Sequence, residues 1–486
     1  MGTQAPNESF LFVHPERGTL WKLFLYATFC DIDAGKVFLE SNDEGLMLIE
    51  AVDRRKLIVF TIAIRKMLSL LNKPMNWTGR IIEFNLNLLS NIAHGTMEIP
   101  TRGSDTFISA IGFCDSRIDL LNKKKSLEAI KEAISAEMPN REIPNRAIVD
   151  LCIMSAKLVY ENDRVVKKVV NNRWNMHFVD YYYCLNDYQN EYDTGVFIMC
   201  DKRTDANLIV ISFRGTKPFD ADNWSTDFDY PWYQCAEGKV HIGFLEAMGL
   251  GDRTKEFSIQ THLSSNVETK TDPLMEMIPY MGKKSAYFAV KSKLESLLKD
   301  NKNAKFVVTG HSLGGALAIL FPTVMELRKE PQLLNRLLGV YTFGQPRIGD
   351  KTLGNFMEER LNKPNPRYFR IVYSNDLVPR VPYDDKSFLY KHFGECIYFN
   401  SLYHGKEMQE EPDKNFFKMG KATGIYFNAV WELMRSFLMK YLYGRDYEEG
   451  WTSMMARVMG ISFPGISAHC PTDYVNSVRL GDVRTN

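Results

Sequence analysis

The stretch FVVTGHSLGGALA, residues 306–318, decides the fold of this chain. Its β-branched beginning is typical of a strand, and the small residues at its end are typical of a helix. Between them lies a G-x-S-x-G turn, the kind of elbow that holds a serine above a sheet edge. Gly310 and Gly314 stand where a Cβ would clash with the neighbouring strand or helix. Ser312 is therefore the candidate nucleophile.

Two positions beside the elbow are candidate donors to an oxyanion hole. The amide of Leu313 lies at the first turn of the departing helix, where the helix dipole favours a developing negative charge. The second candidate is Thr216, through its amide and its hydroxyl. It follows a predicted strand at 208–213 and a Gly-containing polar turn, which is where the other donor is expected.

The candidate acid is Asp376, which comes just after a predicted strand at 368–373. Catalytic groups of open α/β sheets gather at the carboxyl ends of the strands. Asp376 also lies downstream of Ser312, in the order that a nucleophile elbow requires. We therefore expect its carboxylate to orient a histidine.

Three histidines follow the candidate acid in the chain. His392 directly precedes a predicted strand at 396–399, so we expect it at the wrong edge of the sheet. His404 follows that strand closely, and chain topology does not exclude it. His469 comes after a long insertion that returns the chain to the catalytic face. These residues alone leave His404 and His469 open as the base.

The segment that follows Thr216 mixes aromatic and acidic side chains over a short distance. It contains Phe219, Trp224 and Phe228. This composition predicts a lid helix with an apolar underside formed by Trp224 and Phe228. The alternative is a surface helix with one buried tryptophan.

Composition excludes several classes of function. The 486-residue chain is 45% hydrophobic and 24% charged, which is ordinary for a globular protein with a sizeable core. Its net charge of +1 gives no argument for a nucleic-acid partner. Its eight cysteines show no CxxC pair and no metal-ligand spacing, so we expect free thiols in a reducing compartment and no metal site.

Residues 1–140 are expected to form a helical accessory region, with a boundary at two closely spaced prolines, and residues 141–486 the main domain. Three basic residues at 54–56 precede an apolar stretch in which Thr61, Arg65 and Ser69 form one narrow polar stripe. That stretch is shorter than the roughly 20 apolar residues of a spanning helix, and its pattern favours a lipid surface. Packing of this helix on the main domain is the alternative.

An insertion at about 401–460 contains a second aromatic and aliphatic helix, predicted at 425–443. Asn428, Glu432, Arg435 and Ser436 share one of its faces, and apolar residues cover the other. The helix is interpreted as core, as an acyl-chain wall or as an element that docks on a lipid surface.

Five motifs in a fixed order resemble the class 3, fungal-type lipases of the α/β-hydrolase fold. They are residues 213–216, 240–244, 308–315, 342–349 and 375–379. The long N-terminal region and the 401–460 insertion are similar to the plant oil-body triacylglycerol lipase branch. The resemblance implies a mostly parallel central sheet, a Ser312–Asp376–His469 triad, and Thr216 and Leu313 as oxyanion donors.

The resemblance further implies a serine lipase that releases fatty acids from triacylglycerol without a cofactor or metal. Its expected partner is a lipid-droplet or membrane surface, and its expected location is the cytosolic face of an oil body. Two alternatives stay open: a phospholipase or galactolipase of the same fold, and a non-catalytic scaffold that only keeps the fold.

Overall fold

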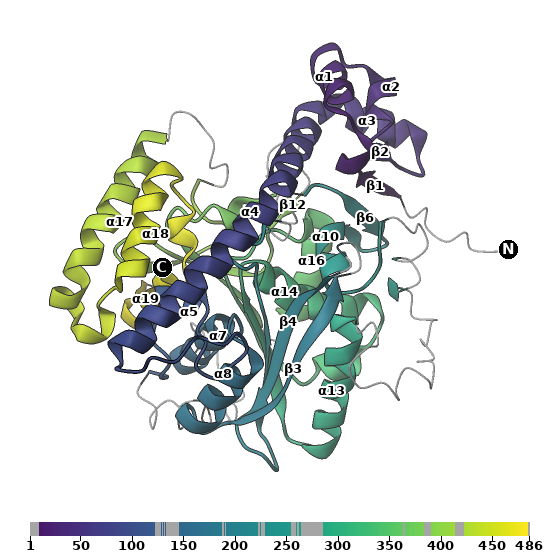
Figure 1. Ribbon diagram of the computed structural model, residues 1–486. Coiled ribbons are helices and arrows are strands. Elements are labelled where there is room, and N and C mark those ends of the chain that lie inside the picture. The colour runs from purple at the N-terminus through teal and green to yellow at the C-terminus, as the bar shows by residue number, and fades with distance from the viewer. Residues whose placement is uncertain are drawn as a thin grey trace.

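The computed structural model describes most of the chain: residues 9–121, 128, 130, 132, 145–186, 189, 191–221, 224, 229–253, 259, 262–263, 285–362, 365–382, 390–413 and 422–484. A central sheet runs through the middle of the molecule with helices on both sides, and one long helix crosses its front (Figure 1).

The central sheet has nine strands, and its middle is parallel. Strands β5, β8, β9, β11 and β13 run in the same direction, whereas β3, β4 and β14 join antiparallel neighbours. In spatial order the strands are β15 (Asp482–Arg484), β14 (His404–Met408), β13 (Glu395–Phe399), β11 (Tyr368–Tyr373), β9 (Leu337–Phe343), β8 (Lys305–His311), β5 (Leu208–Phe213), β4 (Glu191–Cys200) and β3 (His177–Asn186). This is the α/β-hydrolase architecture that the sequence predicts.

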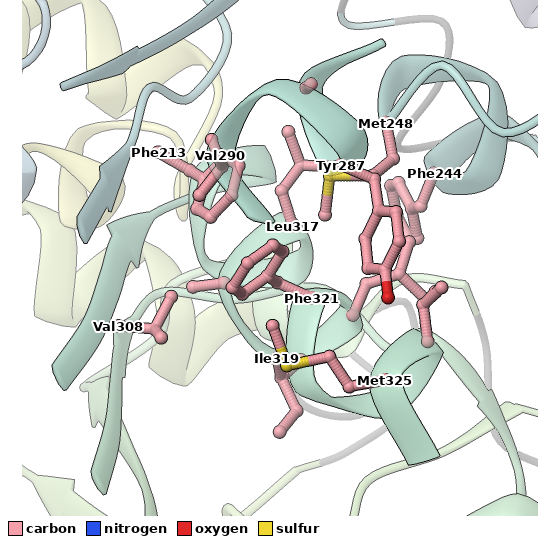
Figure 2. Close-up of a cluster of buried hydrophobic side chains, with 14 of the residues drawn as sticks. Phe213, Phe244, Met248, Tyr287, Val290, Val308, Leu317, Ile319, Phe321 and Met325 are labelled. Carbon is pink, nitrogen blue, oxygen red and sulfur yellow. The ribbon is translucent and has the colours of Figure 1, made fainter. Parts of the chain in front are cut away.

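Both faces of the parallel strands are buried, which explains their almost continuous apolar sequence. Along β5, Ile209 and Ile211 join the core on one face, and Leu208 and Val210 join the core on the other. The first core contains α14 (Leu313–Leu327) and α13 (Ala286–Asp300), whose side chains interlock around Phe321 in Figure 2. The second core contains α7 (Arg146–Leu158) and α19 (Pro471–Leu480).

A second, six-stranded sheet joins the N-terminal segment to the rest of the chain. All its pairs are antiparallel, in the order β12-β10-β7-β6-β1-β2. Its first strand pairs Leu11 with Trp232, so the N-terminal segment shares a sheet with residues from beyond the predicted boundary. The strands are β1 (Phe10–Val13), β2 (Leu39–Glu40), β6 (Trp232–Cys235), β7 (Gly238–His241), β10 (Gly349–Asp350) and β12 (Tyr390–Lys391).

The N-terminal segment is largely helical, and its longest element is α4 (Arg55–Ala93). This helix contains the predicted apolar stretch and continues well beyond it, running diagonally across the front of the molecule (Figure 1). A division at residue 140 stays a prediction, because that residue lies outside the described part of the chain. The other helices here are η1 (Pro15–Arg17), α1 (Leu20–Phe29), α2 (Ile32–Gly35), α3 (Glu44–Asp53) and α5 (Ala110–Cys114).

The predicted 401–460 insertion contains two helices, α17 (Ala422–Tyr443) and α18 (Trp451–Ser462), which pack against each other. Across the described residues, no helix is both long enough and apolar enough to cross a membrane. The remaining short elements are α8 (Asp163–Lys168), η2 (Val169–Arg173), α10 (Ile242–Ala247), α15 (Pro331–Leu334), α16 (Lys351–Leu361), η3 (Val378–Arg380), η5 (Arg445–Tyr447) and η6 (Ser467–His469).

Candidate active site

Ser312 occupies the sharp turn between β8 and α14, with φ 59° and ψ −135°. The turn is possible only because its glycines lack side chains. A Cβ on Gly310 would lie 2.1 Å from the carbonyl oxygen of Gly314, and a Cβ on Gly314 would lie 2.2 Å from that of Phe213. Ser312 is thus held in a backbone conformation that side chains rarely adopt, at the carboxyl end of a central strand.

Asp376 lies beyond the end of β11 and is fully buried. Its Oδ1 accepts a hydrogen bond from the amide of Val378 at 2.9 Å. Its Oδ2 accepts one from the hydroxyl of Tyr474, whose pKa is raised well above its usual value by burial and by the Asp376 charge. The phenol therefore stays protonated and remains a donor to the carboxylate.

His469 is the histidine that the structure brings to this carboxylate. Its Nδ1 donates a hydrogen bond to Asp376 Oδ2 at 2.7 Å. With Nδ1 as the donor, the neutral ring keeps Nε2 as an acceptor. Within the described part of the chain, His469 Nε2 and Ser312 Oγ are both buried without a hydrogen-bond partner. The ring is therefore in the tautomer that could take a proton from a serine.

His311 contacts the backbone of His469. Its Nε2 donates to the carbonyl oxygen of His469 at 2.9 Å, since that oxygen can only accept. Its Nδ1 must then accept from the hydroxyl of Tyr160, 3.0 Å away. Burial lowers the pKa of His311 well below its usual value, so the ring stays neutral. These contacts make His311 a residue that positions His469.

The two other histidines that were considered as the base, His392 and His404, lie elsewhere. His404 is exposed at the start of β14, where it pairs in register with Asp482 of β15. The Nε2 of His392 lies 2.7 Å from the carbonyl oxygen of Pro379. Neither is the residue that contacts Asp376. Of the two histidines that chain topology left open, His469 is the one that makes this contact, and its role as the base stays a prediction.

The predicted oxyanion donors flank the nucleophile. The turn at residues 214–216 lies directly against the elbow, because a Cβ on Gly215 would lie 3.0 Å from Ser312 Cβ. Arg214 fixes this turn through an ion pair with Asp193 at 2.8 Å. Thr216 is buried, and its Oγ1 has no hydrogen-bond partner among the described residues.

Leu313 provides the other predicted donor, because it is the first residue of α14. An amide in the first turn of a helix has no partner within that helix, so it is available to an external oxygen. Leu313 thus directly follows Ser312, and Thr216 belongs to the turn that lies against the elbow. Their hydrogen bonds to a reacting ester stay a prediction.

Of the two predicted lid residues, Trp224 is described and Phe228 lies outside the described residues. The Trp224 ring is centred 6.2 Å from the His469 ring and meets it edge to face. Its Nε1 donates to the carbonyl oxygen of Pro218 at 3.3 Å. The indole therefore lies beside His469, and its role as a lid stays a prediction.

Three residues of this site were not singled out in the sequence. Tyr160, which follows α7, and Tyr474, which belongs to α19, each contribute a hydroxyl to the site. Gly344 has φ 60°, and a Cβ there would lie 2.8 Å from Asp376 Oδ2 and 2.9 Å from His469 Cε1. The position of Gly344 within the 342–349 motif was the one signal that could have identified it. The tyrosines carry no local pattern.

Comparison with known proteins identifies the family of this chain. The family described as Lipase (class 3) matches residues 210–386. The triacylglycerol lipase OBL1 of Nicotiana tabacum is 46% identical over 99% of this chain and 96% of its own length. The Arabidopsis thaliana protein of that name is 47% identical over 97% and 95%, and that of Ricinus communis 45% over 98% and 95%. The chain therefore belongs to the class 3 lipases, together with these plant proteins.

Proposed function

We propose that this protein is a serine lipase that hydrolyses triacylglycerol at a lipid-droplet surface. The observation that carries the proposal is the hydrogen bond from His469 Nδ1 to Asp376 Oδ2, which leaves Nε2 as an acceptor that has no hydrogen-bond partner among the described residues. The names of the three plant relatives support triacylglycerol as the substrate.

In the acylation step, His469 Nε2 takes the proton of Ser312 as the serine oxygen attacks the ester carbonyl carbon. The resulting imidazolium is stabilised by the buried Asp376 carboxylate, whose position is fixed by Tyr474 and the Val378 amide. When the tetrahedral intermediate collapses, Nε2 gives the proton to the departing diacylglycerol oxygen. The product of this step is an acyl-enzyme on Ser312.

In the deacylation step, a water molecule takes the place of the alcohol. His469 removes its proton as the water attacks the acyl carbon, and Ser312 leaves with that proton. In both steps the charge on the carbonyl oxygen is stabilised by the Leu313 amide and by Thr216. Removal of one such donor typically lowers kcat by about 10²–10³-fold.

The lid assignment rests on Trp224, because its ring contacts the ring of His469 edge to face. We propose that this ring moves when an ester carbonyl reaches Ser312. Phe228 is proposed as its companion from the sequence pattern alone. Contact with lipid would favour an open state in which apolar lid residues leave water.

Docking on the droplet is assigned to the N-terminal region. In α1, Trp21 and Phe29 are largely exposed. In α4, Thr61 and Arg65 of the polar stripe face the protein, and Arg65 forms a buried ion pair with Asp229 at 3.0 Å, whereas Ser69 is exposed. The outward side of the helix includes Leu70, which is 81% exposed. Such helices can lie in a phospholipid monolayer.

The test of the reaction is fatty-acid release from emulsified triolein, compared with phosphatidylcholine and galactolipid, with Ser312→Ala as the blank. We expect triolein to be the preferred substrate. Preference for phosphatidylcholine or galactolipid would show that triacylglycerol is not the main substrate. Fatty-acid release by Ser312→Ala at the wild-type rate would overturn the mechanism.

The test of docking uses the full chain, because β1 pairs with β6 and truncation would break a sheet. A fluorescent fusion of Trp21→Gln/Phe29→Gln is compared with wild type in cells with stained droplets. We expect the variant to become more diffuse, and an unchanged droplet signal would contradict the assignment.

A further inference from the structure

Helices α17 and α18 have inverted polarity, with charged side chains turned inward and apolar side chains turned outward. On α17, Glu432 and Arg435 are almost completely buried. On α18, Arg457 is buried to the same extent. An ordinary surface helix has the opposite arrangement.

The inward charges form a closed network with α19. Arg435 pairs with Asp473 at 2.9 Å, and Arg457 bridges Asp473 at 3.0 Å and Glu449 at 2.7 Å. Glu432 accepts a hydrogen bond from the Tyr373 hydroxyl at 3.2 Å. Breaking one partner of such a buried pair is strongly destabilising, so the network fixes which side of each helix faces outward.

The outward side is apolar along both helices, which lie together at one side of the molecule (Figure 1). On α17 it includes Phe427, Phe437 and Tyr441, which are 72%, 59% and 82% exposed. On α18 it includes Met455 and Met459, both more than half exposed. A large apolar patch on a soluble protein marks a site of interaction. We refer to this surface as the α17–α18 face.

The face continues directly to the catalytic histidine. After α18 ends, Phe463 and Ile466 are still exposed, and His469 follows three residues later. The carbonyl oxygen of Gly465 accepts a hydrogen bond from the amide of Leu377, the residue after Asp376. The turn at the end of this face therefore contacts His469 and Leu377, the proposed base and the residue that follows the proposed acid.

We infer that the α17–α18 face is a second lipid-docking surface, which seats the mouth of the active site on the surface of a neutral-lipid droplet. This inference rests on the proposed function, because only an insoluble lipid substrate requires the catalytic turn to meet an apolar phase. Turning polar groups inward and apolar groups outward is the arrangement that hydrocarbon surroundings favour.

Two features favour lipid over a second copy of the chain. The face carries Trp431, Tyr441 and Trp451, and such amphipathic rings prefer the boundary between headgroups and water. A self-interface would also cover the exposed turn that precedes His469, at Phe463 and Ile466. Binding should depend on buried apolar area, so salt should weaken it little.

The test uses the full chain and droplets of triolein coated with a phosphatidylcholine monolayer. The variant Phe437→Gln/Tyr441→Gln changes only exposed positions of the face. The control, Tyr192→Gln, removes a half-exposed aromatic side chain from β4, elsewhere on the surface. Flotation at low and high salt gives the droplet-bound fraction, and hydrolysis of droplet triolein is compared with turnover of a dissolved short-chain ester.

We expect the face variant to lose at least tenfold in triolein hydrolysis relative to ester turnover, with ester turnover within twofold of wild type. The control should match wild type on both. Unchanged triolein hydrolysis in the face variant would overturn the inference, as would a wild-type dimer that the variant dissociates without loss of droplet binding. If wild type turns over the dissolved ester but not triolein, the proposed substrate fails, and loss of flotation by the variant alone decides the docking role.

Discussion

Helices α14 and α17 differ in which of their side chains are buried. In α14 every residue except Glu326 is buried, and the helix packs under the nucleophile with apolar side chains on all sides. In α17 the charged residues Glu432 and Arg435 are buried, and the aromatic residues Phe427 and Tyr441 are exposed. The first helix is typical of a protein core in water. The second is arranged for apolar surroundings outside the protein.

The difference shows that an apolar helix can belong either to the core or to an exposed face. Only the residues that pack against the helix distinguish the two cases. Around α14 the strands and α13 supply apolar side chains, as Figure 2 shows. Around α17 the inner neighbours supply Asp473 and Tyr373, which bind Arg435 and Glu432. Stability therefore depends on apolar packing at one helix and on a polar network at the other.

The largest expected effect is on the reaction rate, which should depend on the residue before α14 and not on α17. Ser312→Ala removes the attacking oxygen and should lower kcat by about 10⁶-fold, because the members of a triad act as a unit. Ser436→Ala on α17 is the matched control and should stay within twofold of wild type. Fatty-acid release and labelling by a fluorophosphonate probe measure both. Turnover by Ser312→Ala at the wild-type rate would remove α14 from the reaction.

His469→Ala should be nearly as damaging, because Ser312 then has no base. His404→Ala should be close to neutral, since His404 lies exposed on β14. The comparison is made by kcat on a dissolved ester at constant pH. The reverse pattern would move the base to His404 and disconnect the α17–α18 insertion from catalysis.

A pair of phenylalanine substitutions tests the comparison through stability. Phe321→Ala on α14 should lower the free energy of unfolding by about 3–5 kcal/mol, because the ring is fully buried. Phe437→Ala on α17 should change it by less than about 0.5 kcal/mol in water. Urea unfolding followed by circular dichroism measures both. Equal losses would mean that the α17–α18 face is covered by protein.

Glu161 is a buried acid at the junction between the N-terminal segment and α7, where the amide and hydroxyl of Ser109 donate to it at 2.8 Å. Burial raises its pKa to about 7. The folded state then holds its proton more tightly than the unfolded state, so stability should fall as the pH rises from about 4.5 to about 7. Over this range the free energy of unfolding should fall by about 3 kcal/mol.

Glu161→Gln stays neutral and should remove this decline, as measured by urea unfolding at pH 5 and pH 7.5. The exposed Glu191→Gln serves as the control and should keep the wild-type slope. An unchanged slope in Glu161→Gln would show that the carboxyl is already ionised at low pH.

The smallest effect concerns Trp224, whose ring contacts that of His469 edge to face. Trp224→Ser should reduce the gain in activity at an oil surface by a few-fold and leave turnover of a dissolved ester nearly unchanged. Rates on both substrates, measured on the same preparation, provide the comparison. Equal losses on the two substrates would make Trp224 a packing residue.

Much of the catalytic centre could be predicted because its constraints are local. The elbow needs glycines at fixed positions around Ser312, and Asp376 follows a strand, so short motifs indicate both. Assigning His469 needed the family resemblance, because the long insertion hides its place in the chain order. The support from Tyr474, Tyr160 and His311 arises from contacts between distant segments and has no local pattern.

The orientation of the outer helices shows the same limit. The sequence placed Arg65 in a polar stripe on one helix and Arg435 in a polar stripe on another. Which side faces the protein depends on Asp229 for the first helix and Asp473 for the second. Both acids lie far away in the chain. The pairing of β1 with β6 likewise joins segments that the sequence treats separately.

The backbone at Ser312 has a consequence for the evolution of this fold. A side chain at φ 59° and ψ −135° costs on the order of 1–3 kcal/mol, whereas glycine adopts such angles freely. Ser312→Gly should therefore be inactive yet more stable than wild type, and Ser312→Ala should gain no stability. The enzyme gives up part of its folding free energy to present one hydroxyl. A descendant released from selection for hydrolysis would gain stability by losing its nucleophile.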